Sequence, residues 1–189
     1  AGNEYLVRLL YKPTRATVFY GQLRGETKSL NVTGESHLSL VLPATRQQYL
    51  LYLDHSPLPA LNLRSRVQMS RYEHAAPTST GYYIGQEINT SFRKSKISGS
   101  YALFDTDDYN SRLYVPEHDV LYAFSVPALS GTGTRMYILW QQSIFRQLDG
   151  WIKLTYTQYR NQQSIGSGLE EIAGPNRTDI RCQLRYRLH

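Results

Sequence analysis

Long hydrophobic runs, cysteine and methionine are all scarce in this 189-residue chain. No stretch approaches the roughly 20 consecutive apolar residues that a transmembrane helix needs, so the sequence excludes a helical membrane protein. The single cysteine, Cys182, excludes an internal disulfide, and its apolar neighbours two positions away identify it as a small hydrophobic residue. The 21 lysines and arginines form no block, so the net charge of +6 does not indicate nucleic-acid binding.

Recognisable catalytic and phosphate-binding motifs are also missing. The five histidines stand in no motif with serine or aspartate, and the chain contains no Gly-X-Ser-X-Gly sequence. The segment Gly166-Ser-Gly168 lacks the third glycine of a dinucleotide-binding loop and the Gly-Lys-Ser/Thr of a P-loop, so we interpret it as a turn. We therefore expect a protein that is not an enzyme and holds no cofactor.

One acidic segment offers candidate metal ligands. Asp105, Asp107 and Asp108 carry the carboxylate oxygens that Ca²⁺ prefers, and Glu117 or Asp119 is available to complete a site. The spacing and the glycine of a calcium-binding loop are absent. We prefer the interpretation that these residues form a solvated acidic loop without a metal, and we keep calcium as the alternative.

Alternation of apolar and polar residues is the main feature that is present. From Ile180 to Leu188 every even position is apolar or aromatic, while Arg181 to Arg187 are polar at every odd position. A period of two residues is typical of a β-strand, and the 16 tyrosines add to a composition that favours strands. The sequence predicts nine strands, at 4–11, 16–26, 46–54, 61–70, 82–92, 96–104, 134–145, 151–160 and 180–189.

The lengths of the strands and connectors suit a membrane barrel. Tilted strands of about nine to eleven residues cross the hydrocarbon core, whereas soluble strands usually have about five or six. Outer-membrane barrels alternate short periplasmic turns with longer extracellular loops. Here short turns are predicted at 12–15, 55–60, 93–95 and 146–149, and the intervening connectors are 27–45, 75–79, 107–133 and 161–177, of which only 75–79 is short.

These patterns predict an all-β fold, an antiparallel transmembrane β-barrel of the outer-membrane type. Residues 1–189 are expected to form one domain, or the C-terminal portion of one, with about nine to ten strands. A mean hydropathy of −0.46 is compatible because a barrel strand needs apolar residues on one face only. Single-chain bacterial barrels have even strand numbers. We therefore expect either a tenth strand, at 119–126 or 36–42, or a barrel completed by strands outside this sequence, which we prefer.

Basic residues recur on the polar side of several predicted strands. If the apolar side meets lipid, the polar side faces the lumen of the barrel. An excess of basic residues in a water-filled lumen favours anions. Alternatively, these residues brace the barrel by pairing with acids from neighbouring strands or from a plug, and this is the interpretation we prefer. The lumen-facing set is Arg64, Arg66, Lys153, Arg181, Arg185 and Arg187.

Four segments carry a more specific resemblance: YALFDTDDY (101–109), DVLYAFSVP (119–127), IGSGLEEI (165–172) and QLRYR (183–187). Together they resemble the C-terminal β-barrel region of Bacteroidota outer-membrane proteins of the helix-hairpin-helix domain-containing family. The resemblance implies an integral protein of the bacterial outer membrane, in contact with lipid and lipopolysaccharide. The helix-hairpin-helix segment and the earlier strands of that family are absent here, which implies a fragment, a processed chain or a barrel completed by another polypeptide.

Two functions are compatible with these expectations. The first is an outer-membrane barrel that serves as a pore, or as a structural or accessory subunit of an envelope complex. The alternative is a soluble β-barrel or sandwich that binds a ligand or partner, in which the apolar positions face inward and the arginine-rich side meets water. The direction in which the arginines of 180–188 point distinguishes the two.

Overall fold

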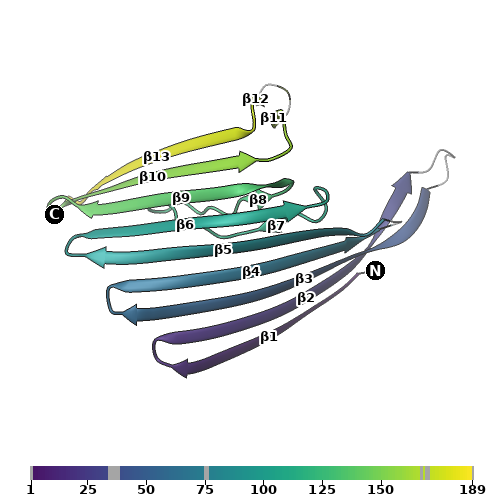
Figure 1. Cartoon of the computed structure of the whole chain (residues 1–189), viewed down its shortest axis with the longest axis horizontal. Helices are drawn as coiled ribbons and strands as arrows, with labels where there is room; N and C mark the ends of the chain where they lie inside the picture. The colour runs from purple at the N-terminus through teal and green to yellow at the C-terminus, as the bar shows by residue number, and fades with distance from the viewer. Residues whose placement is uncertain (1, 34–38, 75–76, 167, 169–170, 189) are drawn as a thin grey trace.

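Nine long antiparallel strands form one sheet in the computed structural model, which describes residues 2–33, 39–74, 77–166, 168 and 171–188 (Figure 1). Within these residues, β1 and β13 are the two edges and do not pair with each other, so the sheet is not closed into a barrel. The predicted all-β antiparallel fold is confirmed. In sheet order the strands are β1 (Asn3–Thr14), β2 (Thr17–Thr33), β3 (Ser39–Leu58), β4 (Leu61–Glu73), β5 (Ser79–Phe92), β6 (Ser95–Thr106), β9 (Thr132–Ser143), β10 (Leu148–Tyr159) and β13 (Asn176–Tyr186).

Alternation along each strand places the apolar residues on one face of the sheet. Leu51, Val67, Ile84 and Leu103 are successive cross-strand partners from β3 to β6, and all four are exposed. Residues directly opposite one another in antiparallel strands lie on the same face, so they form one apolar row. Cys182 is exposed on this face as well, and its thiol is free. No helix among the described residues is long and apolar enough to span a membrane.

The first long connection differs from the sequence prediction of a loop over 27–45. The hairpin of β2 and β3 continues from the pair Thr27 and Thr45 to the pair Thr33 and Ser39. The extension was missed because its alternation is inverted: Leu30 lies on the face opposite to the apolar row, and Pro43 interrupts the pattern. Ladder hydrogen bonds between the two strands nevertheless satisfy the backbone. Part of the candidate tenth strand at 36–42 lies outside the described residues, and its remainder belongs to β3.

Short and long connections lie at opposite ends of the sheet. The turns β1–β2, β3–β4, β5–β6 and β9–β10 are at one end, beside the C-terminus, and the other connections are at the opposite end (Figure 1). Arg93 has a positive φ of 52° in the tight turn that joins β5 to β6. The connection predicted over 161–177 contains a two-stranded ribbon of β11 (Ser164–Ile165) and β12 (Ile172–Ala173), and β13 begins at Asn176. Ser167 of the glycine-containing segment lies outside the described residues.

The connection between β6 and β9 folds back over the sheet. The sequence predicts a long loop over 107–133, and residues 107–131 lie against one face of the sheet (Figure 1). We call these residues the covering loop, the face beneath it the loop-covered face, and the opposite side the outer face. The loop contains the pair β7 (Leu113–Tyr114) and β8 (Ala128–Leu129), and the candidate strand at 119–126 does not join the sheet.

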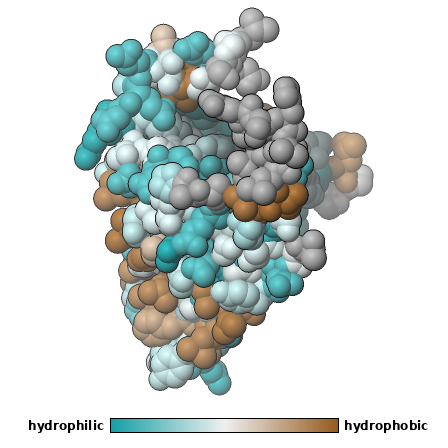
Figure 2. Space-filling model, turned by 90° about the vertical axis from the view of Figure 1, so that its right-hand side faces the viewer, coloured by the Kyte–Doolittle hydropathy of each residue, from teal (hydrophilic) through white to brown (hydrophobic). Residues whose placement is uncertain are grey.

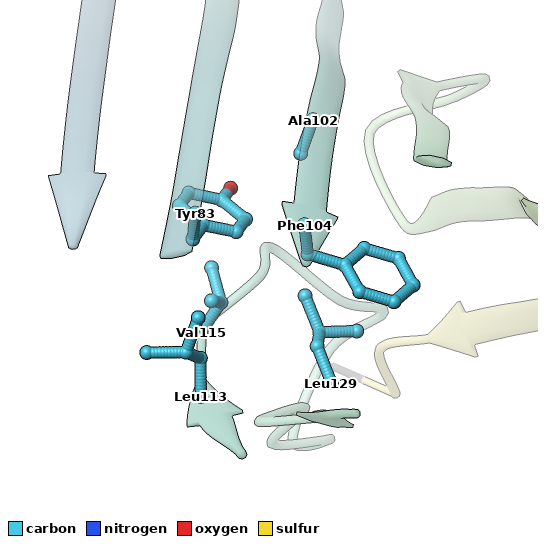
Figure 3. Close-up of a cluster of buried hydrophobic side chains, with 6 residues drawn as sticks. All are labelled: Tyr83, Ala102, Phe104, Leu113, Val115 and Leu129. Atoms are coloured by element: carbon cyan, nitrogen blue, oxygen red, sulfur yellow. The ribbon is translucent and has the colours of Figure 1, made fainter. Parts of the chain in front are cut away.

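Apolar side chains hold the covering loop in place. Burial of such side chains is the main driving force that holds a loop against a sheet. The contacts are non-local in sequence, which is why alternation alone did not reveal them. One cluster packs Leu113, Val115 and Leu129 of the loop against Tyr83, Ala102 and Phe104 of the sheet (Figure 3), and a second packs Val120 and Leu121 against Tyr137, Leu139 and Trp151.

Candidate functional site

Charged residues of the sheet and of the covering loop meet on the loop-covered face. The strand registers set Arg64 and Arg66 opposite Glu87 and Gly85 of β5. Between β10 and β13 they set Lys153 opposite Arg181 and Asp149 opposite Arg185, and Arg187 follows β13 and also contacts Asp149. Five of the six basic residues singled out from the sequence form ion pairs with carboxylates. Glu117 and Asp119 are in the covering loop, and Asp149 lies beside the turn between β9 and β10. The six residues are Arg64, Arg66, Lys153, Arg181, Arg185 and Arg187.

The central cluster contains two acids of the covering loop and three cations of the sheet. Arg135 donates two hydrogen bonds to Glu117, from Nε to Oε1 at 2.5 Å and from Nη2 to Oε2 at 3.1 Å. Lys153 Nζ lies 3.2 Å from Glu117 Oε2 and 3.4 Å from Asp119 Oδ2. Arg181 Nη1 donates to Asp119 Oδ2 at 2.5 Å. The side chains of Lys153 and Asp119 are only 2% and 0% exposed, so these ion pairs replace hydration that both groups have lost.

A second cluster surrounds Arg64. Its Nε donates to Asp54 Oδ2 at 3.1 Å, and its Nη1 lies 3.2 Å from both Glu87 Oε1 and His118 Nε2. An arginine can only donate, so His118 accepts through Nε2 and directs Nδ1 toward Glu87, 3.6 Å away. The Tyr137 hydroxyl donates to the second oxygen of Glu87. The cluster therefore joins four strands of the sheet, β3, β4, β5 and β9, to the covering loop.

A third cluster lies at the short-turn end of the sheet. Asp149 is 2% exposed and accepts hydrogen bonds from Arg185 at 2.6 Å and from Arg187 at 3.2 Å. The Ser143 hydroxyl donates to the other carboxylate oxygen at 2.7 Å. Together these contacts tie the C-terminal strand to the turn between β9 and β10.

The candidate calcium ligands are engaged separately. Asp105 accepts a hydrogen bond from Thr132, and Asp107 accepts two from Thr80. Burial tends to raise the pKa of Asp108, but hydrogen bonds from a serine hydroxyl and from the next turn outweigh it and hold that pKa below its usual value. In the described part of the chain, no three His, Cys, Asp or Glu side chains are grouped so that they could hold a metal. These acids serve as acceptors that organise the start of the covering loop.

A cavity of about 740 Å³ lies between the covering loop and the sheet. Its wall includes the phenols of Tyr20, Tyr52 and Tyr83 and the ring of Phe124 from the loop. Arg66 also lines it, and its Nε is buried without a hydrogen-bond partner. Arg66 is thus the one residue of the predicted basic set that forms no ion pair within the described ranges.

The acids of the covering loop have a different role in the structure from the one that the sequence indicates. Glu117 and Asp119 were considered only as possible metal ligands, whereas they neutralise the basic residues of the sheet. A usable signal was their spacing: two acids two residues apart, between Val115 and Val120, repeat the period-two pattern of the strands with acids in place of bases. Comparison with known protein families, with curated proteins and with solved structures finds no significant match to this chain.

Proposed function

We propose that this chain forms part of the wall of a β-barrel in a bacterial outer membrane and acts there as a structural or accessory subunit of an envelope complex. The observation that carries the proposal is the polarity of the sheet. Its outer face exposes apolar side chains, while the loop-covered face buries charged groups such as Lys153 and Asp149. A barrel in lipid has this polarity, with apolar residues outward and polar residues inward.

The apolar surface is broader than a soluble monomer usually exposes. Rows of apolar side chains cross the sheet from strand to strand, and another row contains Ile97, Trp140 and Ile152. Figure 2, seen from the end that carries the long connections, shows hydrophobic residues gathered along one side and in the lower half. Contiguous exposed patches on soluble monomers rarely exceed a few hundred Å², and larger ones indicate a membrane or a partner.

Strand length supports the same proposal. The nine strands of the sheet have 11 to 20 residues, against the roughly 9 to 11 that a tilted strand needs to cross the hydrocarbon core. β2 and β3, with 17 and 20 residues, are the longest. Their inverted alternation beyond Thr27 fits a hairpin that extends past the lipid, where an outward apolar face is no longer needed.

The covering loop favours a structural role over an open pore. It lies on the face that would line the lumen, and its acids neutralise cations of the wall. A lumen filled in this way is plugged, and its basic residues brace the wall instead of attracting ions from solution.

The edges of the sheet indicate partner strands. In lipid, each unpaired backbone group of an edge strand costs several kcal/mol, so β1 and β13 need neighbours. β1 is also apolar on both faces: Val7 and Leu9 lie on the outer face, while Leu6 and Leu10 are exposed on the loop-covered side. We propose that further β-strands, from another polypeptide or from an upstream segment of the same one, pair with these edges.

The alternative function, a soluble barrel or sandwich, needs the apolar face to be covered. The packed loop lies on the other, charged face, and the described residues place no second layer on the outer face. The arginines of β13 share the loop-covered side with Asp119 and Asp149. This direction favours the membrane proposal.

Fractionation of the native cell envelope tests the proposal. We expect the chain to stay with the membrane after washing with carbonate and high salt, and to be released only by detergent together with the polypeptide that completes the barrel. Recovery of the folded chain in the soluble fraction, without detergent, would contradict the proposal.

A further inference from the structure

Arg66 differs from the other basic residues of the loop-covered face. Two residues before it, Arg64 is flanked across the sheet by Asp54 and Glu87 and pairs with both. Arg66 is flanked instead by Tyr52 and Gly85, neither of which is an acid. Its guanidinium therefore has donors but no carboxylate within the described residues, and a buried donor without an acceptor is unfavourable.

The acids that line the same cavity do not compensate Arg66. Asp54 and Glu87 are engaged by Arg64, and the two acids of the covering loop are engaged by Arg135, Lys153 and Arg181. Arg64 is shared by Asp54 and Glu87, and Lys153 is shared by Glu117 and Asp119. With Arg66 included, five cations meet these four carboxylates, so one positive charge is in excess, and Arg66 is the cation of this group that pairs with none of them. An anionic ligand would provide the ion-pair partner that Arg66 does not have within the described residues.

Three tyrosines line the same cavity as Arg66. Tyr20 and Tyr52 lie on the same face in neighbouring strands, and Tyr83 follows two strands away. A Cβ at Gly85 would collide with the Tyr83 ring, so the glycine allows this ring to lie along the strand beside Arg66. The Tyr20 hydroxyl already donates to Gln22, whereas the phenols of Tyr52 and Tyr83 can donate hydrogen bonds to an anion that the arginine holds.

The rest of the cavity wall is largely apolar. Leu10, Val18 and Leu50 line it from the sheet, and Ala123 and Phe124 line it from the covering loop. Its volume of about 740 Å³ lies within the range of roughly 300 to 1,000 Å³ that is usual for small-molecule sites. An apolar wall beside one cation that forms no ion pair within the described residues suits a ligand with a charged head and an apolar body.

We infer that this cavity binds a small organic carboxylate, with Arg66 as the residue that holds the carboxylate and the apolar wall around the hydrocarbon part. The planar guanidinium matches a carboxylate through two parallel hydrogen bonds. The site is built from the sheet and the covering loop alone, so this inference does not depend on the location of the protein in a membrane.

Titration calorimetry of the full chain in non-ionic detergent, or without detergent if the chain proves soluble, tests the inference with hexanoate as the probe. We expect saturable binding of hexanoate and at least tenfold weaker binding of hexanamide, its neutral analogue. Arg66→Gln should weaken hexanoate binding at least tenfold. The matched control is Arg24→Gln, which removes an arginine of the same face outside the cavity that pairs with Glu4, and it should leave the affinity within twofold.

Several outcomes would overturn the inference. They are the absence of hexanoate binding, equal affinity for hexanamide, an unchanged affinity in Arg66→Gln, or binding of inorganic phosphate as tight as that of hexanoate. If Arg66→Gln does not fold, Arg66→Lys takes its place. This variant keeps the charge but loses the planar pair of donors, so the affinity should fall by several-fold, and an unchanged affinity would contradict the assigned role.

Discussion

Replacing Ile84 with arginine is expected to lower the membrane-bound fraction of the chain, because in the proposed barrel this residue faces lipid. Ile84 is 56% exposed on the outer face, between Val67 and Leu103 in the cross-strand row. At an exposed position of a soluble protein such a change alters the free energy of unfolding by about 0.5 kcal/mol or less. On the lipid face of a barrel, arginine near the midplane costs roughly 2–4 kcal/mol. The membrane-bound fraction of the variant and its stability in vesicles measure the effect.

Ile172→Arg is the matched control for this change. Ile172 is also exposed, but it belongs to β12 in a ribbon outside the main sheet. Its replacement should leave the membrane-bound fraction unchanged. Equal behaviour of the two variants would mean that the outer face does not contact lipid.

The second large effect is expected from Glu117→Gln. The cluster of Glu117, Asp119, Arg135, Lys153 and Arg181 contains two negative and three positive charges, and this change leaves a single acid to face all three cations. Breaking a buried ion pair by removing one partner costs roughly 3–5 kcal/mol. We expect a loss of this order in the free energy of unfolding, together with detachment of the covering loop.

Hydrogen exchange can follow the covering loop directly. The amides of Val115 and Glu117 donate to Pro127 and Ser125 across the loop, so their protection reports whether it stays folded. Lys153→Met is the comparison variant because it leaves two acids with two cations and should cost less than Glu117→Gln. If the loop remained protected in Glu117→Gln, or if Lys153→Met were the more damaging change, the charge cluster would add nothing to the apolar contacts that hold the loop.

The strands of the sheet could be predicted because their information is local. Alternation over 61–70 and 82–92 places Arg64, Val67 and Ile84 on the faces where the structure has them. The hairpin extension into 27–45 could not be predicted in the same way. There the apolar residues change faces and only pairing with the neighbouring strand specifies the structure.

The candidate site was harder to predict than the strands because it depends on contacts between distant residues. The basic residues were recognised from their periodicity, but Glu117 and Arg135 are 18 residues apart, and Asp119 and Arg181 are 62 apart. Only the fold-back of the covering loop brings them together. Arg66 has no acid opposite it in β5 because the strand register places Gly85 there, and the register could not be read from the sequence either.

The ion pairs that hold the covering loop against the sheet also favour a structural subunit over an open pore. Desolvated ion pairs are a weak source of net stability but a strict geometric constraint, because each charge must find its partner. In the proposed barrel, this constraint fixes how the covering loop sits against β9, β10 and β13. The same contacts shape the cavity beside Arg66.

The two tryptophans of the chain allow the most direct test of the proposed orientation in lipid. Trp140 lies on the outer face and is 44% exposed, whereas Trp151 lies beneath the covering loop and is 4% exposed. Fluorescence of the variants Trp151→Phe and Trp140→Phe in vesicles of brominated phosphatidylcholine reports each residue alone. In the proposed orientation we expect strong quenching when Trp140 remains and little quenching when Trp151 remains. Equal quenching of the two, or no quenching of Trp140, would contradict it.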